Sequence, residues 1–122
     1  MSATDILTAG TCQNLLDSVP PVGGMVQCIG IHPVLMPAVE EHAVRLCLTI
    51  SDGNNCLDVV ASFNLASDVV QGYLRLYDII RIISYETFVC YEHKIVILKH
   101  VTGPYLSMGI IRQPTMLSVQ DS

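Results

Sequence analysis

Residues 44–63 have the sequence VRLCLTISDGNNCLDVVASF, and this stretch decides the fold. Its first seven residues alternate as they would in a strand with one buried face. Residues 51–55 (SDGNN) are a strong turn signal, because Gly and Asn tolerate a positive φ. Residues 56–63 are therefore expected to return as the hairpin partner. The expected core face holds Val44, Leu46, Leu48 and Ile50, and the opposite face holds Arg45, Cys47 and Thr49.

The remaining segments extend this hairpin to a barrel. We expect a short helix within residues 4–18, a strand over 25–32 closed by Pro33, and a loop over 33–41. Apolar residues spaced by three and four predict a helix over 65–76. Isoleucine-rich runs predict strands over 78–85 and 94–101, with a hairpin tip at 91–93.

Three strands, a helix and two strands follow the N-terminal helix, which is the order of the OB-fold, a five-stranded, partly open barrel. The predicted fold is therefore mainly β: a five-stranded OB-fold barrel with a short N-terminal helix and a helix between strands 3 and 4. The expected core includes Leu46, Leu48, Ile50 and Ile80. At 122 residues, the chain fits one domain spanning 1–122, ordered over about 4–114, with 115–122 as a tail or the start of a linker.

Composition favours a binding module over an enzyme. Hydrophobic residues make up 51% and charged residues only 14%, against about 25% in an average domain, which predicts an apolar surface. The sequence contains no HExxH, GxSxG or Gly-rich phosphate loop, so we expect no catalysis and no cofactor. Five cysteines without a CxxC pair indicate neither a disulfide framework nor a zinc site.

Charge and hydropathy exclude further classes. The net charge is −5 with only six Lys and Arg residues, which argues against strong DNA binding, since such binding depends on neutralising phosphates. No apolar run approaches the roughly 18 residues that cross a bilayer, and residues 1–10 lack the pattern of a secretory signal. We therefore expect a soluble, intracellular protein with no membrane partner.

Four segments in order resemble a known family. They are residues 26–29 (VQCI), 45–53 (RLCLTISDG), 78–83 (DIIRII) leading to 94–98 (KIVIL), and 108–114 (MGIIRQP). Together they resemble the amino-terminal domain of the large subunit of replication protein A. This resemblance implies a non-catalytic domain in the nucleus that acts in DNA replication, repair and recombination. It also implies that the rest of such a chain binds the other replication protein A subunits.

In that family a groove accepts acidic, amphipathic helical segments of repair and checkpoint proteins, whereas other OB domains hold single-stranded DNA. Carried over to this sequence, the resemblance implies basic positions at Arg45 and Lys94, histidines where arginines are common at His32 and His93, and a lost basic residue at Cys47. Ile95 and Ile97 would form the apolar wall. The implied groove thus has few positive charges, and single-stranded DNA binding would be weak.

Other interpretations of the same residues stay open. Arg45 and Lys94 also suit ordinary solvated strand positions, and His32 and His93 suit ordinary surface histidines. Arg45, Lys94 and Arg81 are the candidate nucleic-acid contacts if the domain binds single strands directly, although Arg81 also suits plain solvent exposure. A third hypothesis is an assembly module whose apolar surface is buried in an oligomer.

Overall fold

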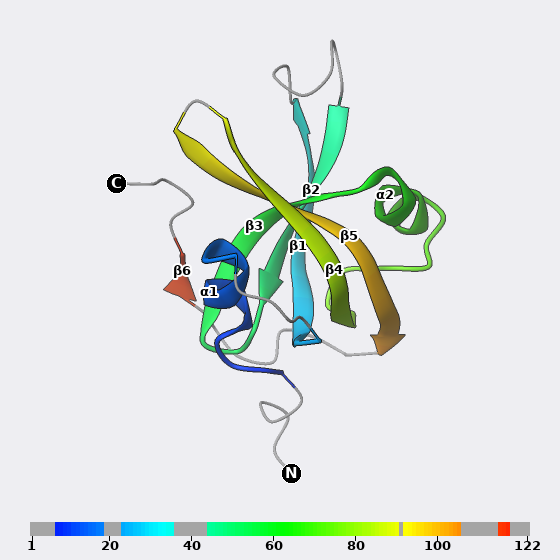
Figure 1. Ribbon diagram of the computed structural model, residues 1–122. Helices are drawn as coiled ribbons and strands as arrows, with labels where there is room; N and C mark the ends of the chain where they lie inside the picture. Colours follow the sequence, from blue (N-terminus) through cyan, green and yellow to red (C-terminus); the bar gives the residue numbers. More distant parts are fainter. Residues whose placement is uncertain (1–6, 19–22, 36–43, 91, 106–114, 118–122) are drawn as a thin grey trace.

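The computed structural model describes residues 7–18, 23–35, 44–90, 92–105 and 115–117 (Figure 1). These residues form two helices and six strands. In chain order the elements are α1 (Thr11–Leu16), β1 (Met25–Leu35), β2 (Val44–Ser51), β3 (Asn55–Ala61), α2 (Phe63–Val70), β4 (Ile79–Cys90), β5 (His93–Tyr105) and β6 (Thr115–Met116). No helix in this described part is long and apolar enough to cross a membrane.

Strand pairing closes a five-stranded barrel. β1 pairs antiparallel with β2 and β4, β2 with β3, and β4 with β5. A parallel pairing of β3 with β5 completes the ring, and the short β6 adds to β3, also in parallel. The β4–β5 hairpin crosses the front of the barrel, with α2 on one side and α1 and β6 on the other (Figure 1). The predicted fold class is confirmed: a mainly-β, five-stranded barrel with an N-terminal helix and a helix between β3 and β4.

The core lies inside this barrel, where the inward residues of every strand meet. Of the four expected core residues, Leu48, Ile50 and Ile80 are fully buried, and Leu46 is half-buried against them. Leu15 of α1 and Leu65 of α2 also pack into this cluster. Further members are Val26, Leu57, Val59, Ile82, Val96 and Leu98.

Three strands run further than the sequence predicts. β1 continues through Pro33 to Leu35, because β4 pairs with β1 only at Met25–Gln27. Beyond that point β1 has β2 as its one described neighbour, and a proline is tolerated at such an edge. β4 extends past Tyr85 to Cys90, where it pairs with the start of β5, and β5 extends past Val101 to Tyr105, where it pairs with the start of β4. The apolar pattern of a buried strand reveals neither extension.

The helices and the C-terminal segment differ from the expectation in extent. Residues 4–6 of the expected first helix lie outside the described residues, and α1 is confined to Thr11–Leu16. α2 starts at Phe63, because the Ser62 side chain accepts a hydrogen bond from the Leu65 N–H and caps the helix. Thr115–Met116, which the sequence assigns to a tail, instead forms β6.

A buried carboxylate joins α1 to the β2–β3 turn. Asp52 is 1% exposed, and its Oδ2 accepts hydrogen bonds from the backbone N–H groups of Gly10 and Cys12, each at 3.0 Å. Its Oδ1 accepts from Asn54 and Asn55 at 3.0 and 2.8 Å. Gly53, between these residues, has a φ of +96°, so the tight turn needs a residue without a side chain. One side chain thus fixes both the turn and the position of α1.

Replacing this carboxylate should therefore destabilise the whole domain. In Asp52→Ala, four backbone donors lose their acceptor, and we expect the free energy of unfolding to fall by about 3 kcal/mol or more. Urea unfolding measures this loss. The matched control Asp68→Ala removes an exposed carboxylate of α2 and should change the stability by less than about 0.5 kcal/mol. Equal stability of the two variants would contradict the anchoring role of Asp52.

Candidate functional site

Side chains from four strands line up on the outside of the barrel. His32 of β1 lies opposite Cys47 of β2, Cys47 lies opposite Val60 of β3, and Val60 is in register with Ile97 of β5. Residues directly opposite each other in a sheet share a face, so these four form one row, which we call the outer row. In β2, β3 and β5 the next residue faces the core instead, as the full burial of Leu48, Ala61 and Leu98 illustrates.

The outer row has an apolar floor. His32 is exposed and Ile97 is half-buried, but Cys47 and Val60 are only 6% and 7% exposed. Because the outer face of a barrel leads to solvent, flanking side chains must cover most of these two residues. The middle of the row is therefore largely covered by its neighbours, and His32 lies at its exposed end.

Three more predicted site residues share this face. Arg45 lies two residues before Cys47 in β2, and Ile95 lies two residues before Ile97 in β5, so strand alternation puts both beside the outer row. His93 has the same orientation at the start of β5, four residues from Ile97, and is exposed. The structure thus gathers His32, Cys47 and Ile97 directly, with the others along the flanking strands.

The remaining predicted residues lie elsewhere. Lys94 lies two residues before Val96 and four before Leu98, both of which are buried in the core. Its side chain therefore leaves β5 on the core side, opposite to Ile95 and Ile97. It does not share the face of the outer row. Arg81 is exposed near the start of β4, opposite Met25 of β1 and Thr102 of β5, and is likewise separate from the row.

The Arg45 side chain contacts α2. Its guanidinium carbon lies 4.3 Å from the centre of the Phe63 ring, which is a cation–π contact. Arg45 and Phe63 also border a hollow of about 330 Å³ between β2 and α2. We call this the α2 hollow, and its walls are Arg45, Leu46, Phe63, Ala66, Ser67, Val70 and Gln71.

The outer face also carries a carboxylate that sequence reasoning missed. Thr49 lies opposite Asp58, and the Thr49 hydroxyl donates a hydrogen bond of 2.5 Å to Asp58 Oδ1. Asp58 is two residues from Val60 in β3, so it faces outward beside the row. Counting residues onward from the turn at 51–55 would have located it. Arg45 and Asp58 therefore put opposite charges beside the row, and Glu86 of β4, which lies opposite Ile97, adds a second carboxylate to this face.

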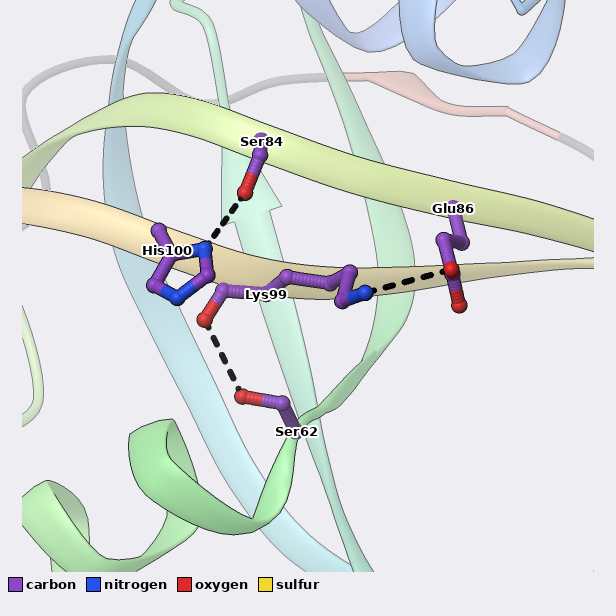
Figure 2. Close-up of polar contacts among 5 residues, drawn as sticks. All are labelled: Ser62, Ser84, Glu86, Lys99 and His100. Carbon is purple, nitrogen blue, oxygen red and sulfur yellow. Dashed lines mark hydrogen bonds and ion pairs between the residues drawn. The ribbon is translucent and has the colours of Figure 1, made fainter.

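Contacts between β4, β5 and α2 border this region (Figure 2). Lys99 Nζ forms a 3.2 Å ion pair with Glu86 Oε1, so its charge is balanced locally. Ser84 and His100 share a hydrogen bond of 2.7 Å. The Ser62 hydroxyl donates to the Lys99 carbonyl at 3.1 Å and thereby fixes the start of α2 to β5 (Figure 2). The Lys99–Glu86 pair is too exposed to add much stability, but it removes Lys99 from the set of available cations.

The Cys47 thiol is not an activated nucleophile. Burial, and secondly the negative charge of Asp58, raise the pKa of Cys47 to about 11. Burial also raises the pKa of Cys28 to about 11. At neutral pH, Cys47 is therefore a neutral thiol beside His32. Among the described residues, no group of three or more His, Cys, Asp or Glu side chains is arranged to hold a metal ion.

No protein-family model matches this chain, and no curated protein matches it either. What stands is the fold itself, a mixed five-stranded β-barrel consistent with the OB-fold.

The α2 hollow is the second feature that sequence reasoning missed. The predicted helix over 65–76 has Leu65, Val69, Tyr73 and Leu76 as its single apolar stripe, but α2 ends at Val70. Phe63, Ala66 and Val70 form another apolar stripe with helical spacing, and this stripe lines the hollow. The spacing alone, once Ser62 is recognised as the helix cap, would have indicated it.

The raised pKa of Cys47 predicts slow alkylation. At pH 8, a thiol with a pKa of about 11 is ionised to the extent of on the order of one molecule in a thousand, and only the thiolate reacts. We expect iodoacetamide to modify Cys47 far more slowly in the folded domain than in urea, with the rate rising as the pH approaches 11. Mass spectrometry of the Cys47 peptide measures both rates, and equal rates at pH 8 would show that the thiol is neither buried nor held neutral.

Proposed function

We propose that this domain is a non-catalytic protein-interaction domain, the amino-terminal OB-fold of a replication protein A large subunit. In this proposal it acts in the nucleus and recruits replication, repair, recombination and checkpoint proteins. Amphipathic helical segments of these partners bind across the outer row, and the rest of the subunit joins the other replication protein A subunits. Single-stranded DNA binds weakly at most.

The observation that carries the proposal is the outer row itself. Its centre, Cys47 and Val60, is apolar and little exposed, and the half-buried Ile97 continues it onto β5. An amphipathic helix binds by placing its apolar anchors into such a floor, with charged groups at the rim. The low charge content of the chain, 14%, agrees with a surface that works by apolar contact.

The rim charges favour a partner that is only mildly acidic. Arg45 attracts carboxylates, but Asp58 on the same face repels them, and the Lys99 charge is balanced by Glu86. A docking role, rather than catalysis at this face, is also supported by the neutral state of the Cys47 thiol.

Two substitutions test this function against an acidic amphipathic helical peptide. Ile97→Glu puts a charge onto the apolar floor, and Arg45→Glu replaces an attraction by a repulsion. We expect Arg45→Glu to weaken binding by about 1.5 to 3 kcal/mol, the usual contribution of a hydrogen bond to a charged group. Ile97→Glu should weaken it by about 1.5 to 3 kcal/mol, the usual value of burying one large aliphatic side chain. Titrations followed by NMR should show shifts at Cys47, Val60 and Ile97 in the unmodified domain.

The matched controls are Arg81→Glu and Ile83→Glu, which make the same chemical changes at exposed positions of β4. Both should bind the peptide normally. Undiminished binding by Ile97→Glu, or shifts confined to other faces, would remove the outer row as the docking surface.

A single-stranded oligonucleotide separates docking from direct nucleic-acid binding. The candidate phosphate contacts are Arg45, Arg81 and Lys94, so at most three counterions are released. We expect a dissociation constant of about 10⁻⁴ to 10⁻⁶ M or weaker at physiological salt, and a log–log salt slope no steeper than about −2. Fluorescence anisotropy at several salt concentrations measures both. Nanomolar binding with a steep slope would make the domain a direct single-strand binder instead.

A further inference from the structure

The helix α2 is apolar on two sides. Leu65 is buried and Val69 half-buried, and both pack against the barrel core. On the side of the α2 hollow, Phe63 and Val70 remain 62% and 80% exposed, with Ala66 between them along the helix. Scattered exposed apolar residues are ordinary, but these line one concave space. Phe63 is in contact with Arg45 and Ala66 packs against the core, but Val70 and most of the Phe63 ring remain exposed.

The dimensions of the hollow fit a side chain. The hollow has a volume of about 330 Å³, and one of its lining residues, Leu46, also packs against the core. Ligand pockets for small molecules and cofactors run from roughly 300 to 1,000 Å³, so this one is at the lower limit. It has room for one large apolar side chain together with a short piece of its backbone.

The charge at one end of the hollow is positive. Arg45 stacks its guanidinium face on Phe63, and the planar geometry leaves its N–H donors free at the edge. In the described part of the chain, no carboxylate forms an ion pair or hydrogen bond with Arg45. Phe63 is also the first residue of α2, whose first turn has no acidic residue to offset the positive end of the helix dipole. The rim thus suits a carboxylate.

We propose that the α2 hollow is a second docking site, which binds a short linear protein segment through one large apolar side chain placed next to a carboxylate. The apolar side chain fills the space between Leu46, Ala66 and Val70, and the carboxylate meets Arg45. This site goes beyond the function proposed above, because its apolar wall belongs to α2 rather than to the outer row; Arg45 is the residue that the two surfaces share. A segment from a partner protein is favoured over nucleic acid, since one guanidinium gives little hold on a phosphate backbone.

The test uses a capped pentapeptide with the sequence Gly-Glu-Trp-Glu-Gly. The domain contains no tryptophan, so the fluorescence of the peptide reports binding directly. We expect Val70→Asp to weaken binding at least tenfold, because it puts a carboxylate into the apolar wall. Val70 is 80% exposed, so this variant should keep the fold, as circular dichroism can verify. The matched control is Val89→Asp, the same change at a valine of β4 that is 65% exposed, and it should bind normally.

A second peptide isolates the charge. Replacing both Glu residues by Gln should weaken binding to the unmodified domain several-fold. Arg45→Gln should weaken the Glu peptide to the same extent and leave the Gln peptide unaffected, which is the pattern of a direct pairing. Equal loss for both peptides would contradict the contact between Arg45 and the carboxylate.

The remaining outcomes separate this site from the outer row and from other occupants. Ile97→Glu should leave pentapeptide binding intact, so failure of the outer row as a docking surface would not affect this test. If Val70→Asp binds the pentapeptide normally, the proposal is wrong. It is also overturned if an oligothymidine strand displaces the peptide, which would assign the hollow to nucleic acid. Sedimentation showing a dimer that Val70→Asp dissociates would assign it to a second copy of the chain.

Discussion

The Asp52 carboxylate is the constraint on which the rest of this structure depends. It is buried, and it satisfies four backbone donors from α1 and from the β2–β3 turn. A fixed turn fixes the register of β2 against β3, and a slip of β2 by one residue would send Cys47 into the core and Leu48 out of it. The apolar floor of the outer row therefore follows from a hydrogen-bonding arrangement at the far end of the same hairpin.

Arg45 stands between two surfaces with different chemistry. Its backbone belongs to the strand that supplies the outer row, whereas its guanidinium rests on Phe63 of α2. Asp58 lies on the same side of the barrel, two residues from Val60, so Arg45 and Asp58 put opposite charges beside the least exposed part of the outer face. Shape and apolar contact should then decide affinity there, while a single directed charge matters at α2. The Ser62 hydroxyl donates a hydrogen bond to the Lys99 carbonyl and so ties the start of α2 to β5, the strand that supplies Ile97.

The fold could be predicted because alternation and turn signals are local. Residues 44–50 reveal their buried face by themselves, and the turn at 51–55 fixes where the next strand begins. The low exposure of Cys47 could not be predicted, since it depends on neighbours in β1 and β3. The family resemblance assigns Lys94 to the groove, but Lys94 lies two residues before the buried Val96 and so faces the other side of β5. The contact of Arg45 with Phe63 joins β2 and α2, which are separated in the chain by β3, and no local pattern encodes it.

The pairing of β6 with β3 bears on how this domain can be cut or fused. Among the described residues, β3 is bonded to β5 at Val60 and Ala61, and its other end, Asn55 and Cys56, is bonded to β6. Without β6, the backbone groups of Asn55 and Cys56 on that side would be open to strands from other chains, a common origin of aggregation. The two residues of β6 thus cover this edge of β3. A shortened domain that ends before residue 115 should therefore be less soluble.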